Sequence, residues 1–465
     1  MKNLLLIWSF GLMNSFTFSQ VSENVNLLYH WDDPNLVGST SYDNTYNEVY
    51  GFIQNGKEYA VIGSTFGTHI FDVTDPINAY LADTIPGASR GAHIIHRDYK
   101  YYKGYLYMVC DEGGGVHPNS SLQIADLSYL PDSVHVVYDS DSLFYMSHNI
   151  FIDTAAAKLY ACSVKSSRGA NGLEVYSLAN PEWPDLLKTF HTFGFIHDCY
   201  SKNDTVFLNA GSDNGLQVVS FTDPQNPQSL GSLTSYPFRG YNHSGWINQK
   251  GNIYAFADEG HGKNIKVADV SDLTDITVLS TFTSGVTSNS IPHNLIIKGD
   301  YVYVSYYYDG LQIFNIADPE NPFKTGYYDT STEINYSSYK GAWGVYPLLP
   351  SGIVLISDMQ NGLFVFDVTG ATEIEKKEFK SRVNSLGVFP NPFSGNLNIS
   401  LLNHTGGKIN YEITDMAGRI ILTNNILLQD NTNYQINTSN FAIGFYLLKI
   451  TGQDFSHIEK LVKIK

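Results

Sequence analysis

Hydrophobic and polar residues alternate between residues 294 and 328 in a way that predicts four short strands. Turn-forming residues separate them at Lys298–Asp300 and Asp309–Gly310, because glycine and aspartate favour tight hairpin turns. The stretch Asp318–Pro322 contains two prolines, which lack the N–H that an inner strand needs, so it is expected to be a loop. The strands are predicted at 294–297, 301–306, 311–316 and 323–328.

The third of these strands belongs to a repeat. Related strings of the type Gly-Leu-Gln-Ile-Phe-Asn-Ile-Ala-Asp-Pro begin at residues 67, 121, 172, 215, 264, 310 and 362. Their spacing averages about 49 residues, which is typical of propellers and solenoids. Seven copies of a four-stranded unit predict an all-β, seven-bladed β-propeller. A solenoid is the alternative, although its repeats usually have fewer strands and lack this Gly/Pro punctuation.

The last copy lacks an obvious fourth strand, because the charged segment Thr372–Lys380 follows it. The segment Val25–Trp31, which precedes the first copy, resembles the fourth strand of the other repeats. We therefore expect the last blade to be completed by the N-terminal strand, which would remove an open sheet edge. The propeller is predicted to span residues 20–375.

The repeated string, together with Gly341–Pro347 and Leu349–Gly352 in the last copy, resembles the LVIVD-repeat propellers of the choice-of-anchor B type. The resemblance covers roughly residues 24–375. It implies a propeller in an extracytoplasmic setting, and it implies no reaction.

The chain changes character after a predicted linker at 376–386. Residues 387–465 alternate as short strands, expected at 397–401, 409–415, 419–424, 433–436 and 445–450, and indicate a small C-terminal β-sandwich. Spaced motifs there resemble a type A C-terminal sorting domain of the type IX secretion system. The motif residues are Pro390, Asn391, Pro392, Asp415, Gly418, Gly444 and Tyr446. An ordinary ligand-binding accessory sandwich is the alternative.

The resemblance of this domain implies Sec export in a Bacteroidetes-like bacterium, transit through the type IX secretion machinery, and removal of the domain. Residues 1–19 agree with export, because Lys2 and the short apolar run Leu4–Met13 are typical of a signal peptide. That run is too short to span a membrane, and no later run reaches the needed length. The predicted location is secreted, extracellular or on the outer cell surface.

The composition of the chain limits the classes of partner that it is expected to bind. Lysine and arginine number 28 and aspartate and glutamate 45, a net charge of −17, which argues against nucleic acid and anionic membranes as main partners. The expected ligand is an unidentified protein, glycan or small molecule. Three cysteines, Cys110, Cys162 and Cys199, are too few for a disulfide framework and are interpreted as small buried hydrophobes.

Candidate functional residues cluster where the first strand of each blade begins, because a histidine stands at the beginning of most of these strands. The ring so predicted contains His93, His148, His197, His243 and His293, with Tyr50 and Trp343 at the matching positions of the other two blades. Loops between second and third strands open on the same face and carry Asp111, Glu112, Asp213, Asp258, Glu259, Asp309 and Asp358. Basic residues shortly before three ring positions are Arg90, Arg239 and Lys340.

Each of these residues also has a structural interpretation. Aspartate before glycine is favoured at hairpin turns, and a histidine repeated once per blade can satisfy backbone carbonyls near the axis. A divalent metal held by His148, His197 and His243 is the sharper hypothesis. No His-Glu-x-x-His or EF-hand motif is present. The first functional hypothesis is therefore a non-enzymatic binding propeller, and the alternative is a metal-dependent or acid–base enzyme, hydrolase-like, acting at this rim.

Overall fold

The computed structural model describes residues 22–113, 117, 119–331, 333, 336–373, 385–402, 407–415, 419–428, 433–451 and 456–464. The chain divides into two compact units, Met1–Glu373 and Ile374–Lys465. The predicted signal peptide, most of the predicted linker and Gly418 lie outside the described residues.

Antiparallel sheets follow one another along the first unit, each built from consecutive strands. The first sheet contains β3 (Tyr46–Gln54), β4 (Lys57–Ser64), β5 (Gly67–Asp72) and β6 (Tyr80–Pro86). The second contains β7 (Arg97–Tyr102), β8 (Tyr105–Cys110), β9 (Leu122–Asp126) and β10 (His135–Ser140). The third contains β11 (Asn149–Asp153), β12 (Lys158–Ser166), β13 (Gly169–Ser177) and β14 (Asp185–Phe190).

The next two sheets repeat this order. The fourth contains β15 (Asp198–Lys202), β16 (Thr205–Asn209), β17 (Leu216–Ser220) and β18 (Gln228–Leu233). The fifth contains β19 (Tyr241–Ile247), β20 (Ile253–Glu259), β21 (Ile265–Asp269) and β22 (Thr277–Phe282). The helical turns of this unit, among the described residues, are η1 (Pro76–Asn78), α1 (Gly211–Asn214) and α2 (Thr369–Thr372).

The last two sheets take strands from both ends of the unit. The sixth contains β23 (Leu295–Lys298), β24 (Tyr301–Ser305), β25 (Leu311–Asn315) and β26 (Phe323–Tyr328), which confirms the predicted strands, and β1 (Ser22–Glu23) adds to its outer edge. The seventh contains β27 (Ala342–Tyr346), β28 (Val354–Asp358), β29 (Gly362–Asp367) and β2 (Asn26–Trp31). The predicted pairing of the N-terminal strand is confirmed, because β2 lies antiparallel to β29.

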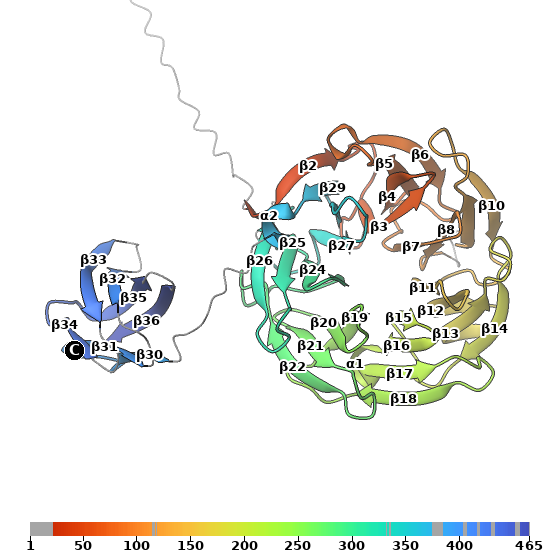
Figure 1. The fold of residues 1–465 in the computed structure, drawn as a ribbon. Coiled ribbons are helices and arrows are strands. Elements are labelled where there is room, and N and C mark those ends of the chain that lie inside the picture. The colour runs from red at the N-terminus through yellow and green to blue at the C-terminus, as the bar shows by residue number, and fades with distance from the viewer. Residues whose placement is uncertain are drawn as a thin grey trace, which may run out of the picture. The chain divides into compact units, whose positions relative to one another are not determined.

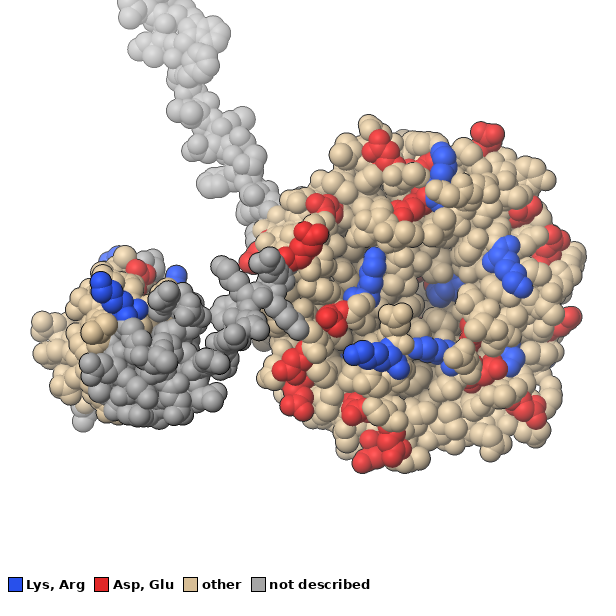
Figure 2. All heavy atoms as spheres, in the orientation of Figure 1, with Lys and Arg blue, Asp and Glu red and all other residues tan. Residues whose placement is uncertain are grey.

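Figure 1 shows these sheets arranged in a ring with the first strands innermost. Each first strand contacts the first strand of the next sheet, and β27 contacts β3, so the circle of first strands is closed. On the face turned to the viewer in Figure 2, several lysine and arginine side chains surround the central hollow, and acidic side chains lie mostly toward the rim.

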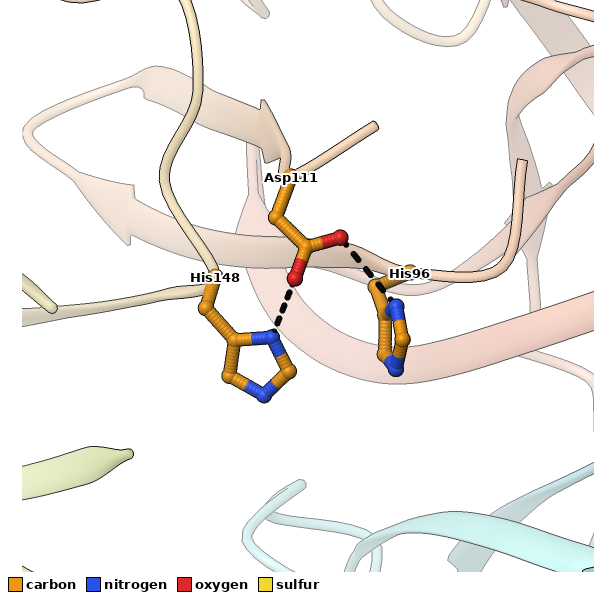
Figure 3. A group of neighbouring side chains, drawn as sticks. All are labelled: His96, Asp111 and His148. Carbon is orange, nitrogen blue, oxygen red and sulfur yellow. Dashed lines mark hydrogen bonds and ion pairs between the residues drawn. The ribbon is translucent and has the colours of Figure 1, made fainter. Parts of the chain in front are cut away.

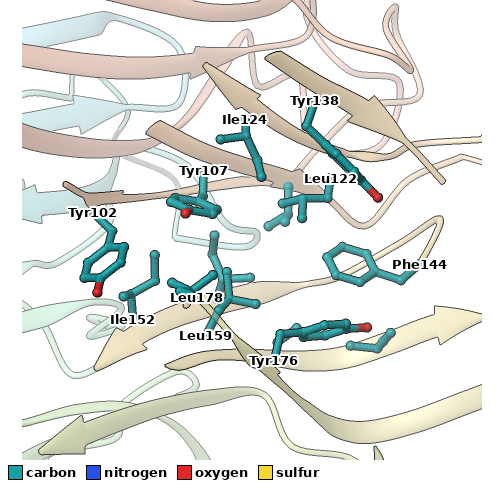
Figure 4. Packing of buried hydrophobic residues seen from close by; sticks show 14 residues of the cluster. Tyr102, Tyr107, Leu122, Ile124, Tyr138, Phe144, Ile152, Leu159, Tyr176 and Leu178 are labelled. Atoms are coloured by element: carbon teal, nitrogen blue, oxygen red, sulfur yellow. The ribbon is translucent and has the colours of Figure 1, made fainter. Parts of the chain in front are cut away.

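Hydrophobic clusters lie between neighbouring sheets. Between the second and third sheets, Tyr107, Leu122 and Ile124 pack against Leu159 and Tyr176, all essentially inaccessible (Figure 4). Side chains of this size contribute roughly 1.5–3 kcal/mol each when fully buried. Each sheet therefore depends on both neighbours, which fixes the innermost strands around the axis.

The second unit has two antiparallel sheets. One contains β30 (Ser385–Phe389), β31 (Asn396–Leu402) and β34 (Asn433–Asn437); the other contains β32 (Gly407–Asp415), β33 (Ile420–Leu428), β35 (Gly444–Thr451) and β36 (Ser456–Lys463). Both sheets contribute to one cluster, with Leu397 and Ile436 from the first and Ile413, Tyr446 and Leu461 from the second. Strands β30 and β36 were not among the predicted strands.

The motif residues of this unit act in its folding contacts. Asn391 donates from Nδ2 to the Lys460 carbonyl at 2.7 Å and accepts at Oδ1 from the Val462 N–H at 3.0 Å. Asp415 accepts from Nε of Arg419 at 2.7 Å. The two Asn391 contacts tie the Pro390–Pro392 turn to the last strand.

Candidate functional site

Aromatic rings lie at the start of six of the innermost strands. His96, His148 and His197 immediately precede β7, β11 and β15, and His293 precedes β23 by two residues. His243 and Trp343 are near the beginnings of β19 and β27. Because the innermost strands form a closed circle, their starts converge at one end of the axis.

The six rings themselves close into a circle, which we call the histidine ring. Consecutive ring centroids are 4.8 Å apart for His96–His148, 4.2 Å for His148–His197, 4.0 Å for His197–His243, 4.4 Å for His243–His293, 4.7 Å for His293–Trp343 and 5.2 Å for Trp343–His96. His148, His197, His243 and His293 therefore each contact rings from the sheets on both sides, whereas Trp343 and His96 contact each other across the first sheet, which supplies no ring member.

One side of the ring carries two carboxylates from the loop after β8, those of Asp111 and Glu112. Figure 3 shows Asp111 between His96 and His148. Asp111 Oδ2 lies 2.5 Å from His148 Nδ1, and Asp111 Oδ1 lies 3.1 Å from His96 Nδ1. Glu112 Oε1 lies 2.5 Å from the same His96 nitrogen, and its Oε2 accepts from the His96 backbone N–H at 2.9 Å. Asp111 thus joins two histidines of neighbouring sheets.

The charged forms of His96 and Asp111 stabilise each other. Burial by itself lowers the pKa of His96, but the carboxylates of Asp111 and Glu112 outweigh it and hold that pKa well above its usual value. Burial would raise the pKa of Asp111, yet the two imidazoles beside it hold it well below its usual value. The pKa of Glu112 is raised by burial and by the neighbouring Asp111. His96 and Asp111 are accordingly an ion pair.

Two other histidines are held by backbone carbonyls. His197 Nδ1 lies 3.1 Å from the carbonyl oxygen of His243, and His293 Nδ1 lies 2.5 Å from that of Trp343. A carbonyl only accepts hydrogen bonds, so both Nδ1 atoms carry protons. Burial holds the pKa of His197 well below its usual value and lowers that of His293 to about 3. Both imidazoles are therefore neutral, with lone pairs on Nε2.

The lone pair of His197 meets a second imidazole nitrogen. His148 Nε2 and His197 Nε2 are 2.7 Å apart. Since His197 Nε2 can only accept, His148 Nε2 must donate a proton to it unless a cation lies between them. With its Nδ1 against the Asp111 carboxylate, His148 is then doubly protonated.

The opposite side of the ring has its own carboxylate. Glu259 Oε2 lies 3.8 Å from His243 Nε2, and Glu259 Oε1 accepts from the Tyr307 hydroxyl at 2.6 Å. His243 Nδ1 is buried and has no hydrogen-bond partner in the described part of the chain. Burial raises the pKa of Glu259.

Two groups of potential metal ligands result, each with ligand atoms within 4.8 Å of one another. One contains His96, Asp111 and His148, and the other His243, Glu259 and His293. The predicted metal set of His148, His197 and His243 is thus divided, because His197 lies between the two groups. His197 contacts His148 of the first group through Nε2 and packs against the ring of His243 of the second.

The ring opens into two hollows. One, of about 180 Å³, is lined by ring members with Tyr42, Tyr307 and Tyr339. The other is a recess of about 870 Å³ that reaches from His148, His197 and Glu259 to Lys165 of the third sheet and to Phe195 of the connection between β14 and β15. A small molecule in the recess would reach the ring nitrogens.

The position predicted for His93 is wrong. The first strand of the second sheet begins at Arg97, so His96 occupies the ring position. His93 instead stacks on His117 at 3.7 Å between centroids and shares a hydrogen bond of 2.9 Å with Ser89. Spacing to the turn was the available signal: His197 stands six residues before the turn residue Asn203, and His96 stands seven before Lys103, whereas His93 stands ten.

Tyr50 also lies elsewhere. It contacts Tyr346 at 4.8 Å between centroids and lines a separate chamber further along the axis. The tyrosines Tyr42, Tyr307 and Tyr339 were not predicted to line the site. They come from connecting segments, whose path over the ring depends on tertiary packing.

Several predicted acidic residues serve the scaffold. Asp258 is fully buried and bonds Lys266 Nζ at 2.8 Å, and Asp358 accepts from Thr330 and two backbone N–H groups of its turn. Asp309 accepts from the Tyr336 hydroxyl at 2.7 Å. Asp213 is exposed in α1. Structural interpretation therefore fits these four better than a role in the ring.

The predicted basic residues lie outside the ring as well. Arg90 is placed over the Phe66 ring at 5.7 Å, and Arg239 donates to the Ser212 carbonyl. Lys340 lies 3.3 Å from Glu333. All three cysteines are buried and unpaired in the described structure, as their interpretation required.

Comparison with solved structures gives propeller-like neighbours at very low identity. The structure named U3-55K matches with a TM-score of 0.50, 9% identity, and coverage of 74% of this chain and 98% of that one. The RRP9 WD40 repeats match with a TM-score of 0.49, 9% identity, and coverage of 74% and 96%. A periplasmic gluconolactonase of Pseudomonas aeruginosa matches with a TM-score of 0.49, 10% identity, and coverage of 84% and 99%. Such likeness shows the fold alone.

No curated protein sequence matches the chain. Among the described residues, no helix has the length and apolar character needed to cross a membrane. Residues 387–465 match the family model described as the secretion system C-terminal sorting domain. The chain therefore carries a type IX secretion sorting domain at residues 387–465, which sends it out of the cell to the surface or the extracellular space.

Proposed function

We propose that residues 20–375 form a seven-bladed β-propeller that binds a divalent transition-metal ion at the histidine ring. The closed circle of innermost strands and the pairing of β2 with β29 support the blade count and the closure. The repeated string supports membership of the LVIVD type, and the shared core of the two C-terminal sheets supports a sandwich.

The observation that carries the metal proposal is the 2.7 Å contact between Nε2 of His148 and Nε2 of His197. Two imidazole nitrogens rarely face each other without a shared proton or a cation. Neutral imidazole is a preferred ligand of zinc and similar ions. An ion between these nitrogens replaces a proton that His148 otherwise has to carry.

The contacts of the Nδ1 atoms also resemble those of metal-ligating histidines. A ligating histidine usually donates a hydrogen bond from its second ring nitrogen to a carboxylate or a carbonyl oxygen. His148 has Asp111 at 2.5 Å, and His197 has the His243 carbonyl at 3.1 Å. His293, with the Trp343 carbonyl at 2.5 Å, has the same arrangement. The three Nε2 atoms are thereby left available at the axis.

The distances fit after a small adjustment. Ligand nitrogens at about 2.1 Å from a tetrahedral ion are roughly 3.4 Å apart. The two rings would therefore separate by about 0.7 Å, which a small rotation of each side chain supplies. A third protein ligand from His243 or His293 would require a further side-chain movement, because the two groups of ligand atoms within 4.8 Å of one another place these residues apart from His148.

The ring would leave a coordination position open toward the recess, as catalytic sites do and structural sites do not. Such an ion polarises a carbonyl or lowers the pKa of bound water. Glu112, Glu259 and Tyr307 are placed beside the ring to accept or donate protons. This arrangement favours metal-assisted hydrolysis, the enzyme alternative, over binding without chemistry.

Metal analysis of the purified full chain tests the proposal. We expect about one zinc, or a similar ion, per chain, and an increase in melting temperature with added zinc, because a ligand that binds only the folded state stabilises it. The double variant His148→Ala/His197→Ala should lose both. His135→Ala, an exposed histidine on β10, is the matched control. A metal-free wild-type chain whose melting temperature ignores zinc would defeat the proposal.

A metal-free binding propeller remains the second candidate, favoured by the size of the recess. A volume of about 870 Å³ is sufficient for a small-molecule ligand. Half-exposed Phe195 and exposed Lys165 give it an apolar and a basic contact. Zinc-independent retention of a glycan or small molecule, lost in Phe195→Ala, would favour this candidate.

We also propose that residues 1–19 direct export through Sec and that the sorting domain is removed later. Deleting residues 387–465 should retain the protein inside the cell. N-terminal sequencing and mass measurement of the exported form would show whether both segments are removed, and fractionation would show whether the product is released or attached.

A further inference from the structure

Further along the axis, the same innermost strands line a second hollow, which we call the axial chamber. Its volume is about 130 Å³, and its walls include the aromatic rings of Tyr50, Phe151, Trp246 and Tyr346. Tyr50 and Tyr346 are 4.8 Å apart between centroids, and Phe151 and Trp246 are 6.1 Å apart. An aromatic wall of this kind attracts cations, because the faces of the rings are electron-rich.

The chamber also contains more acid than base. Three carboxyl groups line it, those of Glu48, Asp98 and Asp198, and among its lining residues only Lys100 is basic. Lys100 Nζ contacts both oxygens of Asp98 at 2.9 and 3.0 Å. That pair is mutually neutralised, so the other two carboxyl groups have no equivalent cation.

Among the described residues, Glu48 and Asp198 accept hydrogen bonds from neutral groups only. Glu48 Oε1 accepts from the Val49 N–H at 3.0 Å and Oε2 from Asn294 Nδ2 at 2.8 Å. Asp198 Oδ1 accepts from the Cys199 N–H at 2.7 Å. Within the described residues, neither carboxyl group has an ion-pair partner within 4.0 Å. Asn294 Oδ1, at the same chamber, is buried and lacks a hydrogen-bond partner.

Burying an unpaired carboxylate is costly. Burial and the nearby Asp98 accordingly raise the pKa of Glu48 to about 8, against the opposing influence of Lys100. A bound cation would supply the missing charge, and its N–H groups would match acceptors that face the chamber, the Asn294 amide oxygen included.

We propose that the axial chamber binds a short aliphatic ammonium ion, with its alkyl part against the aromatic wall and its N–H groups on Glu48, Asp198 and Asn294. The chamber adjoins the histidine ring, because a small hollow of about 20 Å³ is lined both by Glu48 and Asn294 and by the ring histidines. The proposed binding does not depend on a metal at the ring. An engineered apolar cavity of about 150 Å³ accepts benzene, with six heavy atoms. A ligand of about five heavy atoms therefore suits this chamber.

Calorimetric titration of the purified full chain with n-butylammonium chloride tests the site, and 1-butanol serves as the uncharged analogue of equal length. We expect saturable binding of the ammonium ion and at least tenfold weaker binding of the alcohol. Equal binding of both would show an apolar cavity only, and absence of saturable binding would overturn the proposal outright.

Variants assign the effect to residues. Glu48→Gln keeps the shape of the side chain and should weaken n-butylammonium binding about tenfold or more. Asp223→Asn, an exposed aspartate in the loop after β17, should leave it unchanged. Trp246→Leu, which removes one aromatic wall, should weaken it several-fold and provides a second variant if Glu48→Gln folds poorly. Unchanged affinity in a folded Glu48→Gln chain would contradict the proposal.

The wild-type chain offers a measurement that needs no variant. Glu48 faces Asp98, Lys100, Asp198 and Asn294, and it must lose its proton to pair with a cation. Alkylammonium ions stay protonated at pH 9, so affinity should rise roughly tenfold between pH 7 and pH 9. Affinity independent of pH would refute the role of Glu48.

Discussion

The two ends of the axis are built from the same strands and differ in chemistry. Histidines lie near the starts of the innermost strands, as His148, His197 and His243 do. Three residues further along the same strands lie Phe151, Tyr200 and Trp246. The first set offers lone pairs from several directions, which suits a metal ion. The second, with the carboxyl groups of Glu48 and Asp198, suits an organic cation.

This difference shows that depth along one strand can separate two groups of side chains with different chemistry in a repeated fold. The ring is nearly symmetrical because six of the seven sheets each contribute one residue near the start of the innermost strand, whereas the first sheet contributes none. The chamber is asymmetrical, since its acids come from the first, second and fourth sheets only. The variants below test whether the two ends are independent.

The largest effect is expected from removing the facing imidazoles. His148→Ala/His197→Ala should lower zinc affinity at least 1,000-fold, because two ligands and their outer contacts are lost. Affinity for n-butylammonium should change less than threefold. Calorimetry with each ligand measures both. Parallel loss of both affinities in a chain that still folds would mean that the two ends are one site.

A smaller effect is expected when the orientation of one ligand is disturbed. Asp111→Asn removes the carboxylate beside His148 Nδ1 and should lower zinc affinity 10- to 100-fold, as loss of such outer contacts usually does. Competition with a chelating dye measures the change. Asp213→Asn, on the exposed α1, is the control, and an equal loss there would point to general electrostatics.

The free energy of unfolding should depend on pH because Glu48 is buried in the axial chamber. Glu48 has a pKa of about 8 in the folded chain against an ordinary value of 4.5, so the folded state binds more protons between these values. The free energy of unfolding should therefore fall as pH rises from about 5 to 8, by about 1–3 kcal/mol. Denaturant unfolding of wild type and Glu48→Gln measures this slope, which the variant should reduce. An identical slope would disprove the assignment.

The smallest effect is expected at His93. Because His96 holds the ring position, His93→Ala should alter zinc affinity less than threefold, whereas His96→Ala should lower it more strongly through Asp111. Zinc titration of the two variants side by side measures the difference. The reverse order would restore His93 to the ring.

Much of the architecture was predictable because its signals are local. Turn residues such as Gly310 and the alternation in Tyr301–Ser305 depend on neighbours within a few positions, and the strands were found where expected. The sorting domain was recognisable from short motifs such as Pro390–Pro392. The histidines at 148, 197, 243 and 293 followed from the phase of the repeat.

The sequence by itself determined the repeat, the strand order, the closing N-terminal strand and the export domain, since each depends on residues close together or on a regular period. The choice of His96 over His93 depends on where β7 begins, which the spacing to the turn residue Lys103 indicates. Only the tertiary structure decided that His148 meets His197, 49 positions apart, and that Glu48 has no paired cation among the described residues. Contacts between sheets set these features, and no local pattern specifies them.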